Sequence, residues 1–348
     1  MSTMNAVVLD EWGGELDVRT VERPTPDAGE VLVDVRACGV TRTIENAVQG
    51  GLSDADEHVP RIPGHEFAGV VAETGPGVTN FEAGDRVLAY FYLTCGHCDR
   101  CRRGDTNQCT NFGGWFGVQR DGAYAEATTI PESNVLPLPD EATFVDGAVA
   151  ADGLATPLHV CERTGVRDDD TVLVVGAAGR IGVHLSQLAA RRGAHVLAAD
   201  VDEDRLAYVD QVTSDAVTPI DARGDDFAER ARAATPHGEG PMVAVDTVGD
   251  IDTLRDAWDA LALGGDVVSL TTHHERSFAP LLKEFVVKEA SLVGSRYATK
   301  DEVVRAARLL ADDRVTAEYT QTVGLDEVPE VHEALRSGDT HGMTILEP

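Results

Sequence analysis

Lysine is nearly missing from this chain of 348 residues, in which only Lys283, Lys288 and Lys300 occur. With arginine they make 29 basic residues against 60 acidic ones, a formal net charge of −31. Such an excess of negative charge disfavours nucleic acid as a partner, because phosphates attract basic surfaces. The acidic residues are scattered through every segment, so we interpret the surface as adapted to concentrated salt, where the Debye length shrinks to about 3 Å.

Long apolar runs are missing as well. None approaches the roughly 20 residues of a membrane-spanning helix, so we expect no membrane partner. The N-terminal stretch MSTMNAVVLDEWGG has neither a basic start nor a long apolar core, and therefore predicts no signal peptide and a cytoplasmic protein. The six cysteines do not form a disulfide framework, because four of them lie within fifteen residues.

The stretch 171–200 is typical of a strand, a glycine-rich turn, a helix and a second strand. Its first strand, 172–175, is a continuous β-branched and aliphatic run, as expected of a parallel strand buried on both faces. Amide groups at the start of the helix favour a pyrophosphate. Asp200 ends the second strand, where an acid can accept from a ribose 2′-hydroxyl and would repel a 2′-phosphate. The pattern predicts a dinucleotide site that prefers NAD to NADP.

The glycine frame is irregular, because Ala177 stands where the first glycine of G-x-G-x-x-G belongs. The alternative is a tight strand-to-helix turn that binds nothing. The residues that we predict to contact the cofactor here are Gly176, Gly179, Arg180, Ile181, Gly182 and Asp200.

Four cysteines follow the spacing C-x2-C-x2-C-x7-C. They are Cys95, Cys98, Cys101 and Cys109. Two-residue spacings let consecutive thiolates turn toward one centre, and four sulfurs satisfy a tetrahedral Zn²⁺ with no open position. Such a site is structural. Disulfides, which the cytoplasm disfavours, or an iron–sulfur cluster are the alternatives.

The organisation of the chain is α/β with two domains. Residues 1–155 carry strand-and-turn patterns, whereas 156–290 alternate apolar strands with helices and predict a parallel sheet with right-handed crossovers. From 291 to 348 the pattern is mixed again and ends in the short strand MTIL. We therefore expect a nucleotide-binding domain inserted into a β-rich domain that is built from both ends of the chain.

Taken together, the glycine turn, its acid, the cysteine run, GHEFAG at 64–69 and AGDRV at 83–87 resemble the zinc-containing medium-chain dehydrogenases, the alcohol dehydrogenase family. The resemblance covers the whole chain. It implies a GroES-like β-rich catalytic domain with a structural zinc lobe at about 93–112, a Rossmann domain, and an active-site zinc between them. The implied reaction is hydride transfer between a small alcohol or carbonyl substrate and NAD(P). We also expect a homo-oligomer, a dimer or tetramer.

Members of this family hold the catalytic zinc with a cysteine of a G-x-C-x-[ST]-D stretch, the histidine of G-H-E and a third cysteine or acid. His65 and Asp152 match the last two positions, and Glu66, Cys38 or water would complete the shell. The first ligand and the acid that orients the histidine are replaced here. Thr41 and Ile44 stand in their places.

Other positions carry over from the resemblance. Thr43 matches the hydroxyl that takes the substrate proton, and Arg42 matches a contact to the cofactor pyrophosphate. Thr156 matches a residue near the nicotinamide. Met343 stands where some members have a phosphate-binding arginine, and Asn46 where some have a relay histidine.

Competing interpretations remain open. The GAAGRIG turn is closer to the zinc-free quinone reductase branch, so a zinc-independent NAD(P)H reductase of quinones or activated alkenes is the alternative, and a protein that has lost catalysis is a third. His65 could be a buried structural histidine, and Asp152 or Thr43 a cap. The aromatic residues after the cysteine run could line a substrate pocket or cover the zinc lobe. They are Phe112, Trp115 and Phe116.

Overall fold

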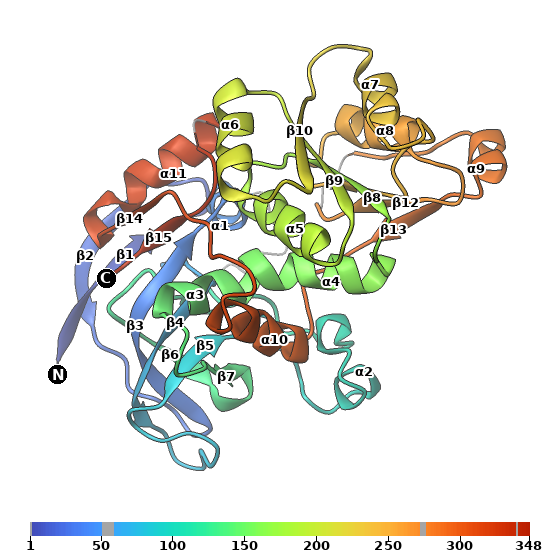
Figure 1. Cartoon of the computed structure of the whole chain (residues 1–348). Helices are drawn as coiled ribbons and strands as arrows, with labels where there is room; N and C mark the ends of the chain where they lie inside the picture. The colour runs from blue at the N-terminus through green and yellow to red at the C-terminus, as the bar shows by residue number, and fades with distance from the viewer. Residues whose placement is uncertain (1, 51–58, 272–275, 339) are drawn as a thin grey trace. The chain divides into compact units, whose positions relative to one another are not determined.

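The computed structural model describes residues 2–50, 59–271, 276–338 and 340–348 (Figure 1). Their contacts divide the chain into two compact units. The first unit joins Met1–Ala155 to Ala298–Pro348, and the second is Thr156–Tyr297. His273 and His274, which the sequence places in a polar loop, lie outside the described residues.

The first unit is built on a mixed, mostly antiparallel sheet of seven strands, in which β3 is central because it pairs with β4, β6 and β15. The strands β1 and β2 pair separately in an antiparallel ribbon. The strands of this unit are β1 (Thr3–Leu9), β2 (Leu16–Glu22), β3 (Glu30–Val40), β4 (Phe67–Thr74), β5 (Arg86–Ala89), β6 (Ala127–Pro131), β7 (Val135–Pro137), β14 (Gln321–Val323) and β15 (Thr344–Leu346).

The first unit also contains helices, and one of them follows β3 directly. They are α1 (Arg42–Val48), α2 (Asp99–Arg102), α3 (Phe144–Val149), the π-helical turn η3 (Ala150–Leu154), α10 (Lys300–Ala311) and α11 (Val328–Ser337). A capping box at Thr143 starts α3: its hydroxyl accepts from the Asp146 amide, and the Asp146 carboxylate accepts from the Thr143 amide. Within the described part of the chain, every helix is too short or too polar to cross a bilayer.

The second unit is a six-stranded parallel sheet in the order β10-β9-β8-β11-β12-β13. Its strands are β8 (Thr171–Val175), β9 (His195–Asp200), β10 (Val217–Asp221), β11 (Val243–Asp246), β12 (Asp266–Ser269) and β13 (Ser291–Gly294). Its helices are α4 (Ala155–Thr164), α5 (Arg180–Arg191), α6 (Glu203–Val212), α7 (Phe227–Ala233), α8 (Ile251–Ala260) and α9 (Leu282–Lys288). The predicted fold class, a β-rich domain plus a Rossmann-type parallel sheet, is confirmed.

Burial explains why these strands read as unbroken apolar runs. All five residues of β8 are buried. Leu173 and Val175 pack into one core with α7 and α8, so the alternate residues Val172 and Val174 face the opposite side of the sheet, which is covered too. Strand β13 pairs in parallel with β12 and continues the sheet past residue 290, the end of the predicted nucleotide-binding domain. The second unit ends at Tyr297.

Candidate active site

Three donor side chains meet inside the first unit. One ligand atom each of His65, Glu66 and Asp152 lies within 4.8 Å of the others, and all three residues are buried. His65 Nε2 is 3.3 Å from Glu66 Oε1 and 3.7 Å from Asp152 Oδ2. Buried acids and an imidazole at such distances need a compensating charge or a shared ligand.

Different elements supply the three donors. His65 and Glu66 directly precede β4, in a segment whose backbone pairs with the turn at Gly122 and Ala123. Asp152 comes from η3, a π-helical turn between α3 and α4. Such turns are frequent at functional sites, and the inserted residue redirects side chains without ending the helix. The backbone is thus shaped to present this carboxylate.

The donor set fits a zinc ion. Tetrahedral Zn²⁺ with bonds of about 2.0–2.1 Å to nitrogen and oxygen places its ligand atoms about 3.3–3.4 Å apart. The distances from the His65 imidazole to the two carboxylates are close to that spacing. Three protein ligands leave a fourth position for water or substrate, which is the arrangement of catalytic zinc.

Thr41 has a structural role in the place of the missing cysteine. It is buried and is the N-cap of α1, where its hydroxyl accepts from the Ile44 amide at 3.5 Å. Ile44 itself is part of the apolar core. Cys38 is fully buried, and its Sγ contacts the Gly39 carbonyl at 3.7 Å. It is not a member of the three-donor group among the described residues.

Of the remaining predicted residues, two are exposed and two are buried. Arg42 and Thr43 are exposed in the first turn of α1. Met343 is buried, and its Cε would lie 2.3 Å from a Cβ at Gly39, so it packs in the interior instead of replacing a phosphate contact. Thr156, from the second unit, is buried in α4.

An aromatic series extends from the histidine. The ring of Phe91 meets His65 edge to face at 4.4 Å, and Phe91 in turn contacts Tyr92, which contacts Phe112. Trp115 packs on Phe112 at 5.5 Å. Phe116 is fully buried against Phe67 and belongs to the core. Phe91 was missed by sequence reasoning, because nothing in a lone phenylalanine before the cysteine run marks contact with His65.

The four cysteines gather as their spacing predicts. Their sulfurs lie within 4.8 Å of one another, with 3.6 Å from Cys109 to Cys95 and 4.0 Å from Cys98 to Cys109. A tetrahedral zinc with Zn–S bonds of about 2.3 Å requires about 3.8 Å between sulfurs, so this donor set also fits the ion. Hydrogen bonds from the backbone, first that of Cys101, lower the pKa of the Cys98 thiol to about 5. The cysteines are unbridged.

In the second unit the glycine turn follows β8. Gly176 has φ +80°, and a Cβ there would lie 2.6 Å from Thr247 Oγ1. A Cβ at Gly182 would lie 2.3 Å from the Gly176 carbonyl oxygen, so α5 can approach the strand only with glycine there. The first intrahelical bond runs from the Val183 amide to Gly179 at 3.0 Å. The amides before it, from Arg180 to Gly182, form the helix N-terminus that suits a pyrophosphate.

Asp200 is tied to this turn. Its Oδ2 accepts from the Ala178 amide at 3.2 Å, and its Oδ1 accepts from the Val201 amide at 2.9 Å. The carboxylate is buried, with the Arg205 guanidinium 3.9 Å away. Arg205 was missed by sequence reasoning. It lies five residues after Asp200 in a charged stretch, and only the fold of α6 brings it back.

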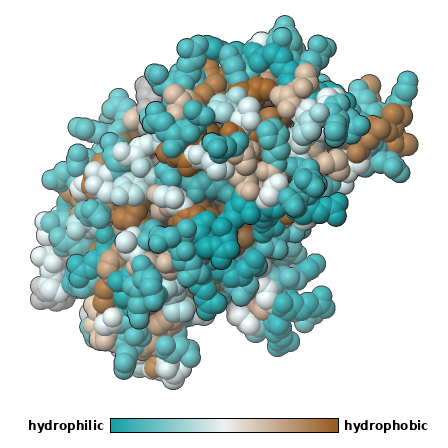
Figure 2. Space-filling view, in the orientation of Figure 1, coloured by the Kyte–Doolittle hydropathy of each residue, from teal (hydrophilic) through white to brown (hydrophobic). Residues whose placement is uncertain are grey.

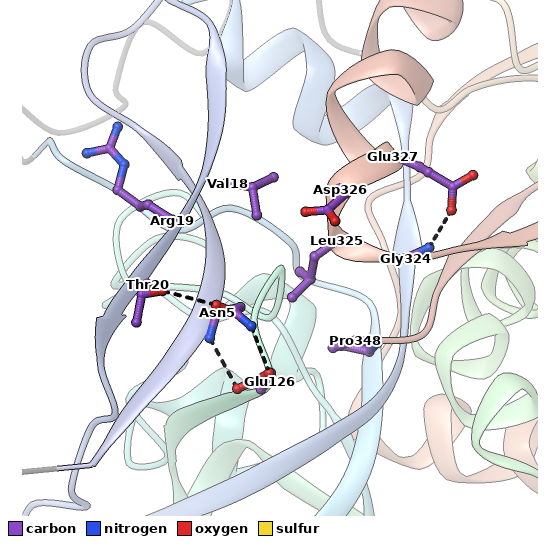
Figure 3. Close-up of a pocket in the computed structure, with 10 residues that line it drawn as sticks. All are labelled: Asn5, Val18, Arg19, Thr20, Glu126, Gly324, Leu325, Asp326, Glu327 and Pro348. Atoms are coloured by element: carbon purple, nitrogen blue, oxygen red, sulfur yellow. Dashed lines mark hydrogen bonds between the residues drawn. The ribbon is translucent and has the colours of Figure 1, made fainter.

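A separate groove of about 680 Å³ lies on the first unit (Figure 3). Its polar lining is largely hydrogen-bonded to itself: Asn5 binds Glu126 and Thr20, and the Gly324 amide donates to Glu327. It contains none of the predicted site residues, and we assign it no role.

Comparison with known proteins bears on both units. A family model of the alcohol dehydrogenase GroES-like domain matches residues 27–140, and one of zinc-binding dehydrogenases matches residues 181–312. L-threonine 3-dehydrogenase of Rhizobium rhizogenes is 32% identical over 329 residues, 91% of each chain. Acryloyl-coenzyme A reductase of Metallosphaera sedula is 28% identical over 345 residues, 99% of each chain.

A solved structure of a thermostable alcohol dehydrogenase from Pyrobaculum aerophilum is 29% identical, with a TM-score of 0.87 over 100% of both chains. The likeness therefore spans the chain from end to end and includes both units. The chain belongs to the zinc-type medium-chain dehydrogenase/reductase family and is an oxidoreductase.

Proposed function

We propose that the protein is an NAD-dependent alcohol dehydrogenase, or carbonyl reductase in the reverse direction, with two zinc sites. The observation that carries the proposal is the buried group of His65, Glu66 and Asp152, whose spacing suits zinc and leaves one position open. Cys95, Cys98, Cys101 and Cys109 would hold the second, structural zinc.

Each residue then has a defined task. His65 and Asp152, with Glu66, would hold the catalytic zinc, which when bound polarises the substrate oxygen. Thr43 would take the proton of the alcohol and pass it to solvent, for which its exposed place at the start of α1 is suited. The bound dinucleotide would accept the hydride of the alcohol carbon, which would turn the alcohol into a carbonyl compound and NAD⁺ into NADH.

The second unit supports NAD as the dinucleotide. The amides of Arg180, Ile181 and Gly182, with the close approach allowed at Gly176 and Gly182, suit the pyrophosphate. Asp200 is oriented by the turn and would accept from the ribose. Arg42 and Thr156 complete the proposed cofactor contacts.

One experiment tests this assignment directly. Metal content per chain is measured for the purified protein and for His65→Ala, together with NADH formation on a panel of primary and secondary alcohols. We expect about two zinc ions per chain, one of them lost in the variant together with alcohol oxidation. Metal at the cysteine lobe alone, with no alcohol oxidised, contradicts the proposal.

A zinc-independent NAD(P)H reductase of quinones or activated alkenes is the second candidate. Two observations favour it: Thr41 caps a helix where the cysteine ligand would stand, and one relative is an acryloyl-coenzyme A reductase. It leaves the buried group of His65 and Asp152 without a chemical task, so we place it second.

We further propose two functional domains, residues 1–155 with 291–348 and residues 156–290, the second of which ends before Tyr297, the last residue of the second compact unit. We also propose that the protein is a cytoplasmic enzyme of a salt-adapted organism. The support is the net charge of −31 and the hydrophilic surface in Figure 2. Because screening weakens as the Debye length grows to about 10 Å near 0.1 M salt, the melting temperature should fall on dilution from molar KCl. An unchanged melting temperature contradicts the salt adaptation.

We propose that the protein forms a homo-oligomer, a dimer or tetramer, through a surface of the second unit. Four side chains around α9 are 66–83% exposed: Leu281, Leu282, Val286 and Val287. They form the apolar patch at the right of Figure 2, at the position of α9 in Figure 1. Apolar patches on a charged protein mark interfaces. Light scattering of Leu282→Asp should show a smaller assembly than the unaltered protein, and a monomer in both contradicts the proposal.

A further inference from the structure

A buried ionic group joins α1 to α11, two helices that pack together although they lie near opposite ends of the chain (Figure 1). Glu45 of α1 accepts from His332 Nδ1 at 2.8 Å and from Arg336 Nε at 2.8 Å. Glu45 and His332 are 2% and 1% exposed, whereas the Arg336 side chain reaches solvent. The carboxylate is therefore buried but doubly hydrogen-bonded.

The group continues inward through a tyrosine. His332 Nε2 is 3.3 Å from the Tyr124 hydroxyl, and the two rings meet edge to face at 5.7 Å. The Tyr124 hydroxyl in turn donates to the Gly39 carbonyl at 3.4 Å. The imidazole of His332 therefore links the Glu45 carboxylate on one side to the Tyr124 hydroxyl on the other.

Tyr124 and Gly39 both border the three-donor centre. The ring of Tyr124 lies where a Cβ of Gly64 would be, at 2.4 Å, and Gly64 directly precedes His65. The Gly39 amide donates to the Glu66 carbonyl at 2.8 Å, and a Cβ on Gly39 would lie 3.0 Å from Glu66 Oε2. The same network thus contacts Gly64, which precedes His65, and reaches Glu66 through Gly39.

We propose that Glu45, His332 and Tyr124 are positioning residues for the centre of His65, Glu66 and Asp152. They lock the end of β3, the start of α1 and the turn before β4 into one arrangement. Thr43 lies two residues before Glu45, so the same lock fixes the proposed proton acceptor. This inference rests on the proposed function for the meaning of the centre, but its test reads metal binding directly.

The energetics favour positioning over bulk stability. Replacing a buried ion pair by apolar residues is often neutral or stabilising, so such a pair is weak support for a purely stabilising role. A fully satisfied polar network, by contrast, tolerates a single geometry, because each donor and acceptor must meet its partner. A metal centre needs such precision, since its ligands must be held to within a fraction of an ångström.

The test uses Tyr124→Phe and Glu45→Gln, with Tyr90→Phe as the matched control. Tyr90 is also a buried tyrosine of the first unit, but its hydroxyl donates to the Ala298 carbonyl and contacts Thr106. Cobalt(II) replaces zinc in the full chain, and its visible absorption and dissociation constant report the His65 centre, with the cysteine lobe resolved by its sulfur-to-metal charge-transfer bands.

Both test variants should weaken cobalt binding at the centre by about tenfold or more and alter its spectrum, because supporting residues of metal ligands have effects of that size. kcat for alcohol oxidation should fall with it while the KM for NAD is unchanged. Tyr90→Phe should change only the melting temperature. If Tyr124→Phe and Glu45→Gln lower the melting temperature but leave the cobalt affinity and spectrum unchanged, their role is structural and the inference is wrong.

The two proposals fail in different ways. If the unaltered protein binds cobalt at the centre but oxidises no alcohol, the proposed function is wrong and the cobalt comparison still decides the positioning role. If the unaltered protein takes up cobalt only at the cysteine lobe, there is no metal centre to position and this inference is overturned.

Discussion

The cysteine lobe and the His65 centre both bring candidate zinc ligands together, but they differ in where the ligands come from and how far they are buried. The lobe collects four identical thiols from one short stretch, Cys95 to Cys109, and three of them are partly exposed. The centre collects an imidazole and two carboxylates from two distant segments and buries all three. Thiolates hold zinc strongly and close its coordination, whereas the mixed set leaves a position open.

The difference teaches which part of a site depends on the rest of the fold. The sulfurs of the lobe are held by hydrogen bonds from the lobe's own backbone, since the Cys98 and Cys101 amides donate to the sulfurs three residues before them. The centre needs the π-helical turn at Asp152 and the glycine contacts around His65. We therefore expect changes in the lobe to act on stability and changes at the centre to act on chemistry.

The largest effect is expected from the lobe. Cys98→Ser should lose one metal ion per chain and lower the free energy of unfolding by on the order of 5 kcal/mol, because structural zinc contributes about 10–16 kcal/mol of binding energy to small zinc domains. Metal analysis and denaturant unfolding measure both. Cys161→Ser is the control, since Cys161 is buried in the second unit outside the cluster. Retention of the metal in Cys98→Ser would falsify the assignment.

The centre should respond in activity. His65→Ala and Asp152→Ala should each lower kcat for alcohol oxidation on the order of 10³-fold, because a Lewis-acid zinc supplies several kcal/mol to the transition state. The lobe metal and most of the unfolding free energy should remain. Steady-state kinetics with metal analysis on the same preparation measure this.

The outcome also separates the two candidate functions. A zinc-independent reductase has no use for either side chain, so both variants would keep hydride transfer nearly intact and added zinc would do nothing. Full activity of both variants on the best substrate therefore replaces the alcohol dehydrogenase proposal by the reductase.

The same contrast explains what the sequence could predict. The lobe was readable from spacing alone, because its ligands are local and their geometry follows from the chain itself. The fold class followed from the apolar strands around the glycine turn. Strand β10 and strand β13 were not predicted, because their short sequences contain polar residues at an edge of the sheet.

The centre was less predictable. His65 and Asp152 came from resemblance to a family, and their proximity is visible only in the fold. The sequence indicated that Thr41 replaces a metal ligand, but it did not predict that Thr41 caps α1, because the start of that helix is visible only in the structure. The bond between Glu45 and His332 spans 287 residues of sequence, and no local pattern points to such a pair.

A smaller effect is expected at the cofactor. Asp200→Ala should reduce the preference for NAD over NADP by about 10–100-fold, because it removes both the ribose acceptor and the charge that repels a 2′-phosphate. It also frees Arg205, which lies beside the carboxylate, for a phosphate. kcat/KM for both cofactors measures the change. Equal values for NAD and NADP in the unaltered enzyme refute the assignment of Asp200.

The smallest effect concerns the ionic support of the centre and its dependence on pH. Burial raises the pKa of Glu45, but the hydrogen bonds from His332 and Arg336 outweigh it and leave the pKa below the ordinary value of 4.5. A carboxyl group with a lowered folded-state pKa stabilises the protein above its unfolded pKa, and this contribution is lost as the pH falls through the folded value. When the pH is lowered from about 6 to about 3.5, the free energy of unfolding should therefore fall more in the unaltered protein than in Glu45→Gln, which has no carboxyl group to protonate at this position.

The size of this loss is about 1 kcal/mol, since a hydrogen bond to a charged group contributes about 1.5–3 kcal/mol and one to a neutral group about 0.5–1.5. Unfolding in urea at several pH values, in concentrated salt, measures the difference between the two proteins. Glu82→Gln serves as the control, because Glu82 is exposed. We expect the curves of the unaltered protein and Glu82→Gln to run parallel and that of Glu45→Gln to be flatter on the acid side. Parallel curves for all three would mean that folding does not shift the pKa of Glu45, and that the centre is supported by packing instead of charge.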